Sequence, residues 1–189
     1  MSKAYILMAD GVEEVEAIAT ADVLKRAGVE VELIGITPLK MAVDGSHGIK
    51  IMVNDFFNGD VEYALDRFGN ADAIILPGGK AGTENLSKSQ ETAELVKKYY
   101  NDGKHVCAIC AAPTVLAACG ILDGLEATCY PGFETKLADA IYVNEPVKVT
   151  GTVITGRSMG TAIDFGLAIA KVLVGNETAA KVEASLCRS

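Results

Sequence analysis

The sequence predicts an α/β protein in which a mostly parallel sheet lies between two layers of helices, a three-layer α/β/α sandwich. Short β-branched and apolar runs alternate with amphipathic helical stretches along the whole chain, which is the pattern of a parallel sheet with crossover helices. Tight-turn residues such as Pro77-Gly78-Gly79 close the apolar runs. At 189 residues the chain can bury one good core, so we predict a single domain over residues 1–189.

The N-terminal half begins with a βαβ unit. A strand over residues 5–8 leads into a helix over 12–27, which Gly28 ends, and a second strand follows over 30–36. After a loop over 38–48, we expect strands over 49–53 and 73–76 and helices over 61–68 and 89–101.

In the C-terminal half, a strand over 106–109 runs into a turn at Cys110-Ala111-Ala112, which opens a helix to about Cys119. Further on we expect a strand over 127–130, a hairpin over 147–149 and 152–155, and helices over 160–174 and 178–186. Ligands bind outside the carboxyl ends of parallel strands. Residues 10–16 and 77–79, Cys110 and Arg157 all follow strands and should share that edge of the sheet.

Composition excludes several functions. The chain has 25 acidic and 17 basic residues and a net charge of -8, so it offers no basic face and we expect no nucleic-acid partner. No apolar stretch has membrane-spanning length, and the N-terminal run over 4–9 is too short for a signal-peptide core. We therefore expect no membrane partner and a cytoplasmic location.

The five cysteines are an odd number in a chain without an export signal, which disfavours a disulfide framework and leaves at least one free thiol. The only histidines are His47 and His105. This scarcity removes most ways of building a zinc site or a nucleophile-histidine pair, and we expect no metal.

Cys110 is the candidate nucleophile. It ends an apolar strand and begins a helix, so the helix N-terminus should lower the pKa of its thiol and make it reactive. The alternative is that Cys110 is a small buried packing residue. A redox pair with Cys107 is disfavoured, because three residues of strand span about 10 Å and a disulfide needs Cα atoms within about 7 Å.

Glu16 is the candidate partner. On a helical wheel it falls within an apolar arc, whereas Glu13 and Glu14 point elsewhere; the arc comprises Val12, Val15, Ala19, Val23 and Ala27. A buried carboxylate is costly, so burial should raise its pKa, and such groups are functional candidates. The alternative is an ion-paired or helix-edge carboxylate that reaches water.

Two other positions bear on the site. The Pro77-Gly78-Gly79 turn is either a simple tight turn or a source of unobstructed backbone N–H groups for an oxyanion or a carboxylate. His105 begins the strand that Cys110 ends and so lies roughly 16 Å away, which is too far for it to act as the base.

Three segments resemble the signature segments of the DJ-one/ThiJ/PfpI superfamily: Ala9-Asp10-Gly11-Val12-Glu13-Glu14-Val15-Glu16, Leu76-Pro77-Gly78-Gly79 and Ala108-Ile109-Cys110-Ala111-Ala112-Pro113. The similarity covers nearly the whole chain and is closest to the parkinsonism-associated branch. It implies a flavodoxin-like (Rossmann-like) homodimer with a nucleophile-elbow cysteine, with the helix-one face and His47 as possible interface elements. It also implies that Cys110 is the oxidisable nucleophile, that Glu16 is a protonated carboxyl bonded to it, and that the amides of Gly79 and Ala111 line the site.

The resemblance implies cysteine-dependent conversion of 2-oxoaldehydes such as methylglyoxal to hydroxy acids, of the glyoxalase III or deglycase type, without a cofactor. A small reactive aldehyde or a glycated molecule would be the substrate, bound by Gly78, Gly79, Ala111, Tyr130 and Arg157. The nearest branch commonly has histidine where this chain has Tyr130, so Glu16 would have to move the protons. The alternative is a non-enzymatic oxidative-stress sensor or chaperone acting through oxidation of Cys110. A cysteine peptidase is disfavoured, because that branch has histidine where this chain has Ala111.

Overall fold

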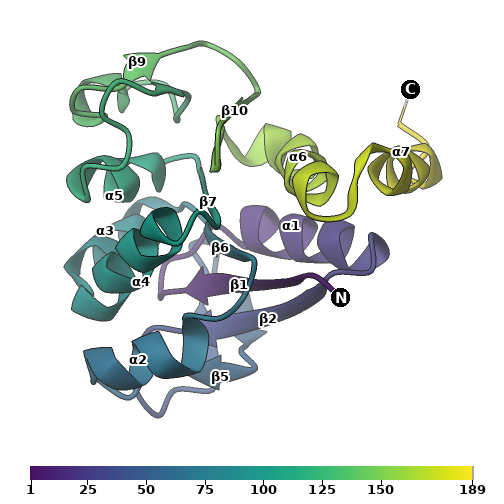
Figure 1. Ribbon diagram of the computed structural model, residues 1–189. Helices are drawn as coiled ribbons and strands as arrows, with labels where there is room; N and C mark the ends of the chain where they lie inside the picture. The colour runs from purple at the N-terminus through teal and green to yellow at the C-terminus, as the bar shows by residue number, and fades with distance from the viewer. Residues whose placement is uncertain (189) are drawn as a thin grey trace.

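The structure, a computed structural model, describes residues 1–188 and is built around a seven-stranded sheet (Figure 1). All neighbouring strands are parallel except the last pair, β11 and β10, which form an antiparallel hairpin. From one edge to the other, the strands are β5 (Asp55–Phe56), β2 (Glu30–Gly35), β1 (Lys3–Met8), β6 (Ala73–Leu76), β7 (His105–Ile109), β11 (Val153–Gly156) and β10 (Val147–Thr150).

The α/β class is confirmed, and the strand order refines it. The five inner parallel strands run β2-β1-β6-β7-β11, which is the 2-1-3-4-5 order of flavodoxin-like sheets. The order reverses next to β1, between β1 and β6, and sheets of this kind bind ligands outside the strand ends at that point.

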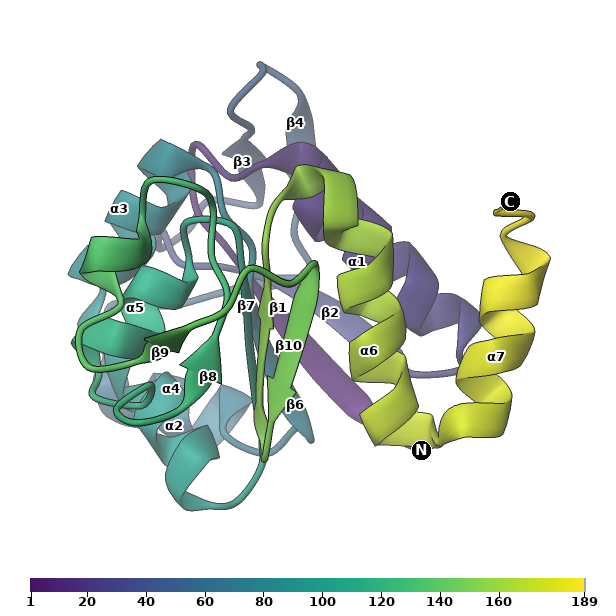
Figure 2. The ribbon, with the colours of Figure 1, turned by 90° about the horizontal axis from the view of Figure 1, so that it is seen from above.

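Helices cover both faces of the sheet (Figures 1 and 2). One face packs against α1 (Glu14–Arg26) and α6 (Ala162–Val174), and α7 (Asn176–Ser185) packs on α6. The other face is covered by α2 (Val61–Phe68), α3 (Lys80–Lys88), α4 (Gln90–Asn101) and α5 (Pro113–Ala118). Side chains of β1 alternate between two buried cores, as the period of a strand requires. Ile6 and Met8 face α1, whereas Tyr5 and Leu7 face the opposite layer.

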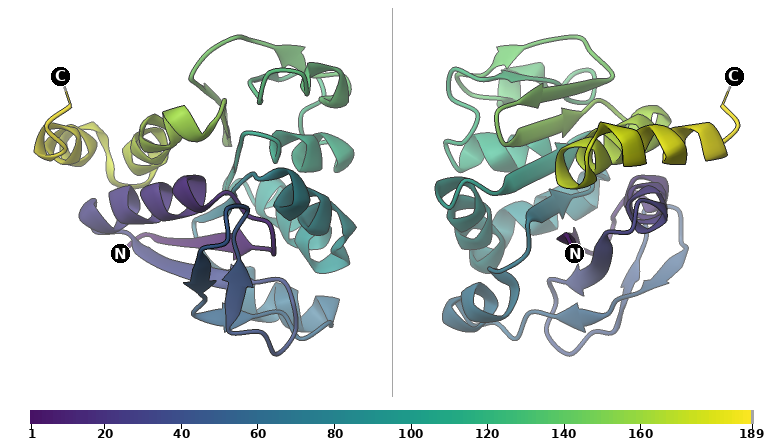
Figure 3. Two further views of the ribbon diagram at one scale, coloured as in Figure 1. Left: turned by 180° about the vertical axis from the view of Figure 1, so that it is seen from behind. Right: turned by 45° about the vertical axis from the view of Figure 1, so that its right-hand side comes forward.

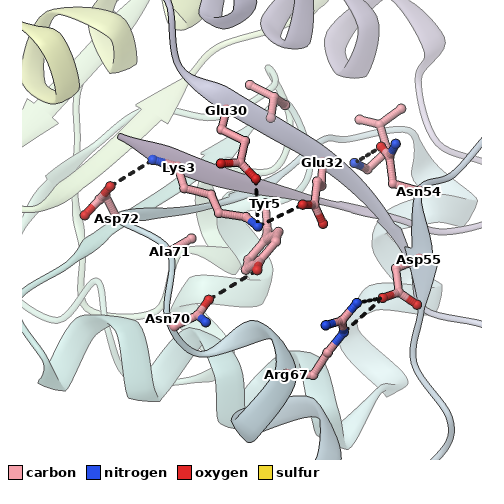
Figure 4. Close-up of polar contacts among 12 residues, drawn as sticks. Lys3, Tyr5, Glu30, Glu32, Asn54, Asp55, Arg67, Asn70, Ala71 and Asp72 are labelled. Atoms are coloured by element: carbon pink, nitrogen blue, oxygen red, sulfur yellow. Dashed lines mark hydrogen bonds and ion pairs between the residues drawn. The ribbon is translucent and has the colours of Figure 1, made fainter. Parts of the chain in front are cut away.

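Polar contacts hold the β5 side of the sheet in register (Figure 4). The Lys3 ammonium lies 3.0 Å from the Glu30 carboxylate and 2.8 Å from that of Glu32, so it joins β1 to β2. Arg67 of α2 pairs with Asp55 of β5 at 2.9 Å. Because these ion pairs are partly exposed, we assign them the role of fixing the register of the strands more than that of stabilising the fold.

Two short two-stranded sheets lie outside the main one. β3 (Ala42–Asp44) and β4 (Lys50–Met52) form an antiparallel hairpin that docks beside the start of α1, where Gly45 bridges to Val12 (Figure 3). β8 (Glu126–Ala127) pairs with β9 (Ile141–Tyr142) next to a 3-10 turn, η1 (Glu134–Lys136). Within residues 1–188, no helix combines the length and the apolar character that crossing a membrane requires.

The elements predicted over 61–68 and 73–76 agree with α2 and β6 residue for residue, and the C-terminal hairpin is confirmed. Other expectations were wrong. Helix α3 and the short strands β5 and β9 were not predicted, β3 lies in an expected loop, and the strand expected over 127–130 ends at Ala127. It ends there because the chain turns back, and the Tyr130 N–H donates to the Cys110 carbonyl at 2.8 Å.

Candidate active site

Cys110 occupies a strained turn directly after β7. Its φ is +66°, a left-handed backbone conformation that is uncommon for a residue with a side chain. The turn is held because the Cys110 N–H donates to the Gly156 carbonyl of β11 at 2.9 Å. A half-buried thiol at a strained strand exit has the geometry of a nucleophile elbow.

Glu16 lies in the first turn of α1 and is completely buried. Its Oε2 accepts a hydrogen bond from the Gly78 N–H at 2.8 Å, and its Oε1 is buried with no hydrogen-bond partner within residues 1–188. Burial raises the pKa of this carboxyl to about 7, although interactions with the Cys110 thiol and the Gly78 N–H oppose the rise. At neutral pH, Glu16 can therefore both accept and donate a proton.

The prediction that Glu16 faces inward is confirmed, as is the burial of Val12, Val23 and Ala27, but the predicted placements of Val15 and Glu14 were wrong. Val15 is 45% exposed, whereas Glu14 is only 5% exposed. The inner face of α1 carries small residues because α1 packs closely on α6. At Gly166 of α6, an added Cβ would lie 3.0 Å from the Val23 Cβ and 3.4 Å from the Thr20 Cα. Close helix packing therefore outweighs hydrophobicity at these positions.

The thiol of Cys110 differs from expectation. Burial and the adjacent Glu16 carboxylate raise its pKa to about 12, and the backbone N–H groups of Gly79 and Ala111 only partly oppose this. The predicted lowering by a helix N-terminus fails because α5 begins three residues later, at Pro113, and has only six residues. The pair is therefore a buried base beside a protonated thiol.

The two glycines after β6 are required by space. An added Cβ at Gly78 would lie 2.6 Å from Glu16 Oε2 and 2.7 Å from the Cys110 Cβ. At Gly79, whose φ is +86°, it would lie 2.2 Å from the Gly11 carbonyl oxygen. Of the two groups predicted for these amides, an oxyanion or a carboxylate, the Gly78 N–H binds a carboxylate, that of Glu16. The N–H groups of Gly79 and Ala111 remain directed at the sulfur.

A cavity of about 310 Å³ opens over Cys110. Of the predicted site residues, it brings together Cys110, Gly79, Ala111 and Tyr130, with Glu16 buried behind the thiol. Arg157 was expected at this site but does not line the cavity. The rest of the wall is formed by Glu13, which lies in the segment 10–16 expected at this edge but was not named as a site residue, and by Lys80 and Phe133, which sequence reasoning missed.

Position along the chain indicates two of these three residues. Glu13 lies in the same loop after β1 as Asp10, and Lys80 follows Gly79 directly. Phe133 gave no such signal, because it lies in a segment without regular structure and reaches the cavity only through the tertiary fold.

Neither histidine reaches the thiol. His105 begins β7 and so lies at the end of the strand opposite to Cys110, as predicted. Nδ1 of His47 lies 3.0 Å from Glu14 Oε2 and 3.6 Å from Glu13 Oε2. Glu13, Glu14 and His47 could together hold a metal ion, but both Glu14 oxygens already accept hydrogen bonds from the hairpin turn. This cluster is accounted for as an ion pair.

The loop after β1 is fixed from two sides. The Asp10 carboxylate accepts hydrogen bonds from the Lys40 ammonium at 2.6 Å and from the Asp44 N–H at 2.9 Å. The Asp10 carbonyl accepts one from the side chain of Asn85 in α3, also at 2.9 Å. These contacts tie the loop that carries Glu13 to the hairpin and to α3, so the cavity wall is formed in advance of ligand binding.

Comparison with known proteins agrees with this architecture. The model of the DJ-1/PfpI family matches residues 2–172. Protein dj-1beta of Drosophila melanogaster is 37% identical over 189 residues, covering 98% of this chain and 97% of that protein. Its crystal structure superimposes with a TM-score of 0.88 at 35% identity and covers 100% of both chains.

Two further relatives have similar identity. The Parkinson disease protein 7 homolog of Danio rerio is 36% identical over 187 residues, covering 97% of this chain and 96% of that protein. DJ-1 homolog B of Arabidopsis thaliana is 37% identical over 186 residues, covering 97% of this chain, but the chain spans only 41% of that protein's length. The chain belongs to the DJ-1/PfpI family.

Proposed function

We propose that the protein is a cysteine-dependent glyoxalase or deglycase that converts 2-oxoaldehydes such as methylglyoxal to hydroxy acids. The observation that carries the proposal is the placement of the buried base Glu16 beside the Cys110 thiol under a small cavity. A group with a pKa of about 7 is well suited to move protons at neutral pH. The cavity of about 310 Å³ suits a substrate of a few heavy atoms.

In the first step, the Glu16 carboxylate accepts the thiol proton as the Cys110 sulfur bonds to the aldehyde carbon of methylglyoxal. The aldehyde oxygen gains the negative charge and then a proton, which gives a hemithioacetal. The N–H groups of Gly79 and Ala111 are directed at the reacting sulfur and favour negative charge there.

In the second step, Glu16 removes the hydrogen of the former aldehyde carbon as a proton while the ketone oxygen gains a proton, which gives an enediol. A proton then adds to the former ketone carbon as the hydroxyl on the former aldehyde carbon loses its proton. The former aldehyde carbon is thereby oxidised to a thioester and the ketone carbon is reduced to an alcohol, so no outside oxidant or reductant is needed. Water then cleaves the thioester, which releases lactate and restores the Cys110 thiol.

Tyr130 supplies a hydroxyl rather than an imidazole at the mouth of the cavity. Its ring packs edge-on against Phe133, with the centroids 6.3 Å apart, and its side chain is 46% exposed. We assign it the role of a hydrogen-bond donor to the substrate. Proton transfer then rests on Glu16.

The test is lactate formation from methylglyoxal by purified, metal-free protein in the presence of a reductant. Wild type should turn over, and Cys110→Ser should lose at least about 100-fold in kcat/KM because the nucleophile is gone. Absence of lactate from the reduced wild type would reject the proposal for methylglyoxal.

A second candidate function is sensing of peroxide. Cys110 is half-buried and thus reachable, and Glu16 and the N–H groups of Gly79 and Ala111 could hydrogen-bond the oxygens of a sulfinic acid. The test is mass spectrometry after limited peroxide treatment. Oxidation of Cys110 before Cys119 and Cys187, together with absent turnover of methylglyoxal, would favour this role.

We also propose that two copies of the chain associate, in the cytoplasm. All five cysteines are free, which suits a reducing compartment. The outer face of α1 and the β3–β4 hairpin form an apolar groove that includes Val15, Ile18 and Ile49. Apolar surface of this kind on one face favours protein association, and we assign it to a second copy of this chain.

A further inference from the structure

The cavity over Cys110 adjoins a second cavity that no step of the proposed mechanism uses. The outer cavity has a volume of about 180 Å³, and Lys80 and Phe133 form part of the wall of both cavities. It lies where α3, α5 and the turn η1 meet, and α3 and α5 are adjacent in the fold (Figure 2). A molecule that reacts at Cys110 could therefore extend into it.

Two lysines without a carboxylate partner line the outer cavity. Neither Lys80 nor Lys136 forms an ion pair among residues 1–188, although most lysines of this acidic chain do. Lys136 is instead held over the face of the Phe133 ring, 4.9 Å from its centroid. With Glu84 as the acidic group of the wall, two positive charges face one negative charge.

A buried hydroxyl points to a ligand independently of these charges. Thr83 of α3 is 6% exposed and lines the outer cavity, and its Oγ1 has no hydrogen-bond partner within the described part of the chain. Buried polar atoms are nearly always hydrogen-bonded, and a helical threonine can usually bond the preceding turn. The Thr83 hydroxyl has no such bond here, and a ligand in the outer cavity that reached it would supply one.

The two cavities differ in charge, and this difference determines how a substrate that spans both is oriented. The inner cavity carries Glu13 as well as the shared Lys80, with Glu16 behind the thiol, so its positive charge is offset. The outer cavity adds Lys136 and the Thr83 side chain, with Glu84 as the one acidic residue of its wall. An anionic group bound there would leave a carbonyl group at the other end of the molecule facing Cys110.

We propose that the outer cavity is a substrate subsite for a carboxylate or phosphate group, so that the preferred substrates are anionic 2-oxoaldehydes. This inference rests on the proposed function for the reaction at Cys110, but binding in the subsite can be measured without turnover. Lys136 and Thr83 are the residues that decide specificity, since both lie in the outer cavity and neither lines the inner one.

The experiment measures how well an unreactive ligand protects Cys110 from alkylation by iodoacetamide, read on the Cys110 peptide by mass spectrometry. The probes are 4-oxopentanoate, which has a ketone and a carboxylate, and its neutral methyl ester. Wild type should bind the anion about five-fold more tightly than the ester, as partly exposed charge pairs allow, and added salt should reduce the preference.

Lys136→Met and Thr83→Val should each reduce this preference. Lys88→Met is the matched control, because Lys88 ends α3 but lines neither cavity, and it should keep the preference. Equal protection by the two probes in wild type, or a preference that survives in Lys136→Met, overturns the subsite. Intact preference together with absent methylglyoxal turnover would instead reject the proposed function and leave the anion subsite standing.

A kinetic comparison completes the test. The ratio of kcat/KM for 4,5-dioxopentanoate to that for its methyl ester should exceed 1 in wild type and fall about five-fold in Lys136→Met. Replacing the carboxylate probe by a phosphate-bearing 2-oxoaldehyde distinguishes the two anions. A ratio of 1 in wild type contradicts the proposal.

Discussion

The protonation state of Glu16 affects both the stability of the protein and the proton transfer at its site. Its pKa in the folded chain is about 7, against an ordinary value of 4.5. Between these two pH values the unfolded chain releases the proton while the folded chain retains it, so the free energy of unfolding falls as pH rises. This loss of unfolding free energy levels off above pH 7, at about 3 kcal/mol.

Glu16→Gln should remove this loss together with the base. As pH rises from 4.5 to 8, the free energy of unfolding of the variant should increase relative to that of wild type by about 3 kcal/mol. Urea unfolding at both pH values measures this change. The kcat/KM of the variant for methylglyoxal should fall by at least about 100-fold. In wild type, kcat/KM should rise through pH 7 as Glu16 ionises, and the variant should lack this rise. Identical pH dependence of unfolding in the two proteins would show that Glu16 is not the group responsible.

The backbone of Gly78 runs between the two reactive side chains. A methyl group there would lie 2.6 Å from Glu16 Oε2 and 2.7 Å from the Cys110 Cβ, so one of them must move. We expect Gly78→Ala to lower kcat/KM by about 100-fold and to cost about 1 to 3 kcal/mol of stability. Gly160→Ala is the control, because its Cβ would meet nothing closer than 3.9 Å; equal losses in both variants would contradict the argument.

At the scale of elements, Glu14 joins helix α1 to the β3–β4 hairpin. Burial alone would raise its pKa, but hydrogen bonds from the side chain and backbone of His47 and from Ser46 lower it to about 2. The pKa of His47 is raised by the same contact. The contribution of Glu14 to the free energy of unfolding is therefore present above about pH 4.5 and is lost as pH falls toward 2. The contribution of His47 is complete below about pH 6.5 and is lost as pH rises through the pKa of His47 in the folded chain.

Glu14→Gln should therefore destabilise the protein most between about pH 4.5 and 6.5, by roughly 1 to 2 kcal/mol. Hydrogen exchange of the Ile49 and Ser46 amides should quicken in the same window, because the hairpin loosens from α1. Glu62→Gln, at an exposed position without an ion pair among residues 1–188, should change neither. A uniform loss across all pH values would mean that the ion pair does not contribute.

How far the sequence predicts an element depends on whether local signals agree with packing. Asp60 accepts a hydrogen bond from the Tyr63 N–H and caps α2, and that helix was predicted to the residue. Helix α3 was missed because Gly82, Thr83 and Ser87 are weak helix formers, and its position is fixed by the Gly82 N–H bonding the Gly11 carbonyl at 3.0 Å. The buried position of Glu16 was predictable from helical period, but the pKa of Cys110 was not, because it depends on burial and on a carboxylate far away in sequence.

At the scale of the whole molecule, one group of exposed apolar residues lies on α1 and the β3–β4 hairpin region. Val15 and Ile18 of α1 are each 45% exposed, and Ile49 and Met52 of the hairpin region are 60% and 66% exposed. These residues come from two elements that dock on each other, so they form one surface, which Glu14 connects to His47 and hence to the wall of the active site. A second copy seated on this surface would shield its apolar side chains and support the hairpin.

We therefore expect wild type to sediment as a dimer at micromolar concentration, and Ile18→Glu to sediment as a monomer because it places a charge in the apolar surface. The monomer should also lose activity toward methylglyoxal by several-fold, since the hairpin that contacts Glu13 through His47 and Ser46 would lose its support. Tyr100→Glu places the same charge on α4, which covers the opposite face of the sheet, and should remain dimeric and active. A monomeric wild type would refute this assignment of the surface, and a monomeric but fully active Ile18→Glu would show that the site is complete within one chain.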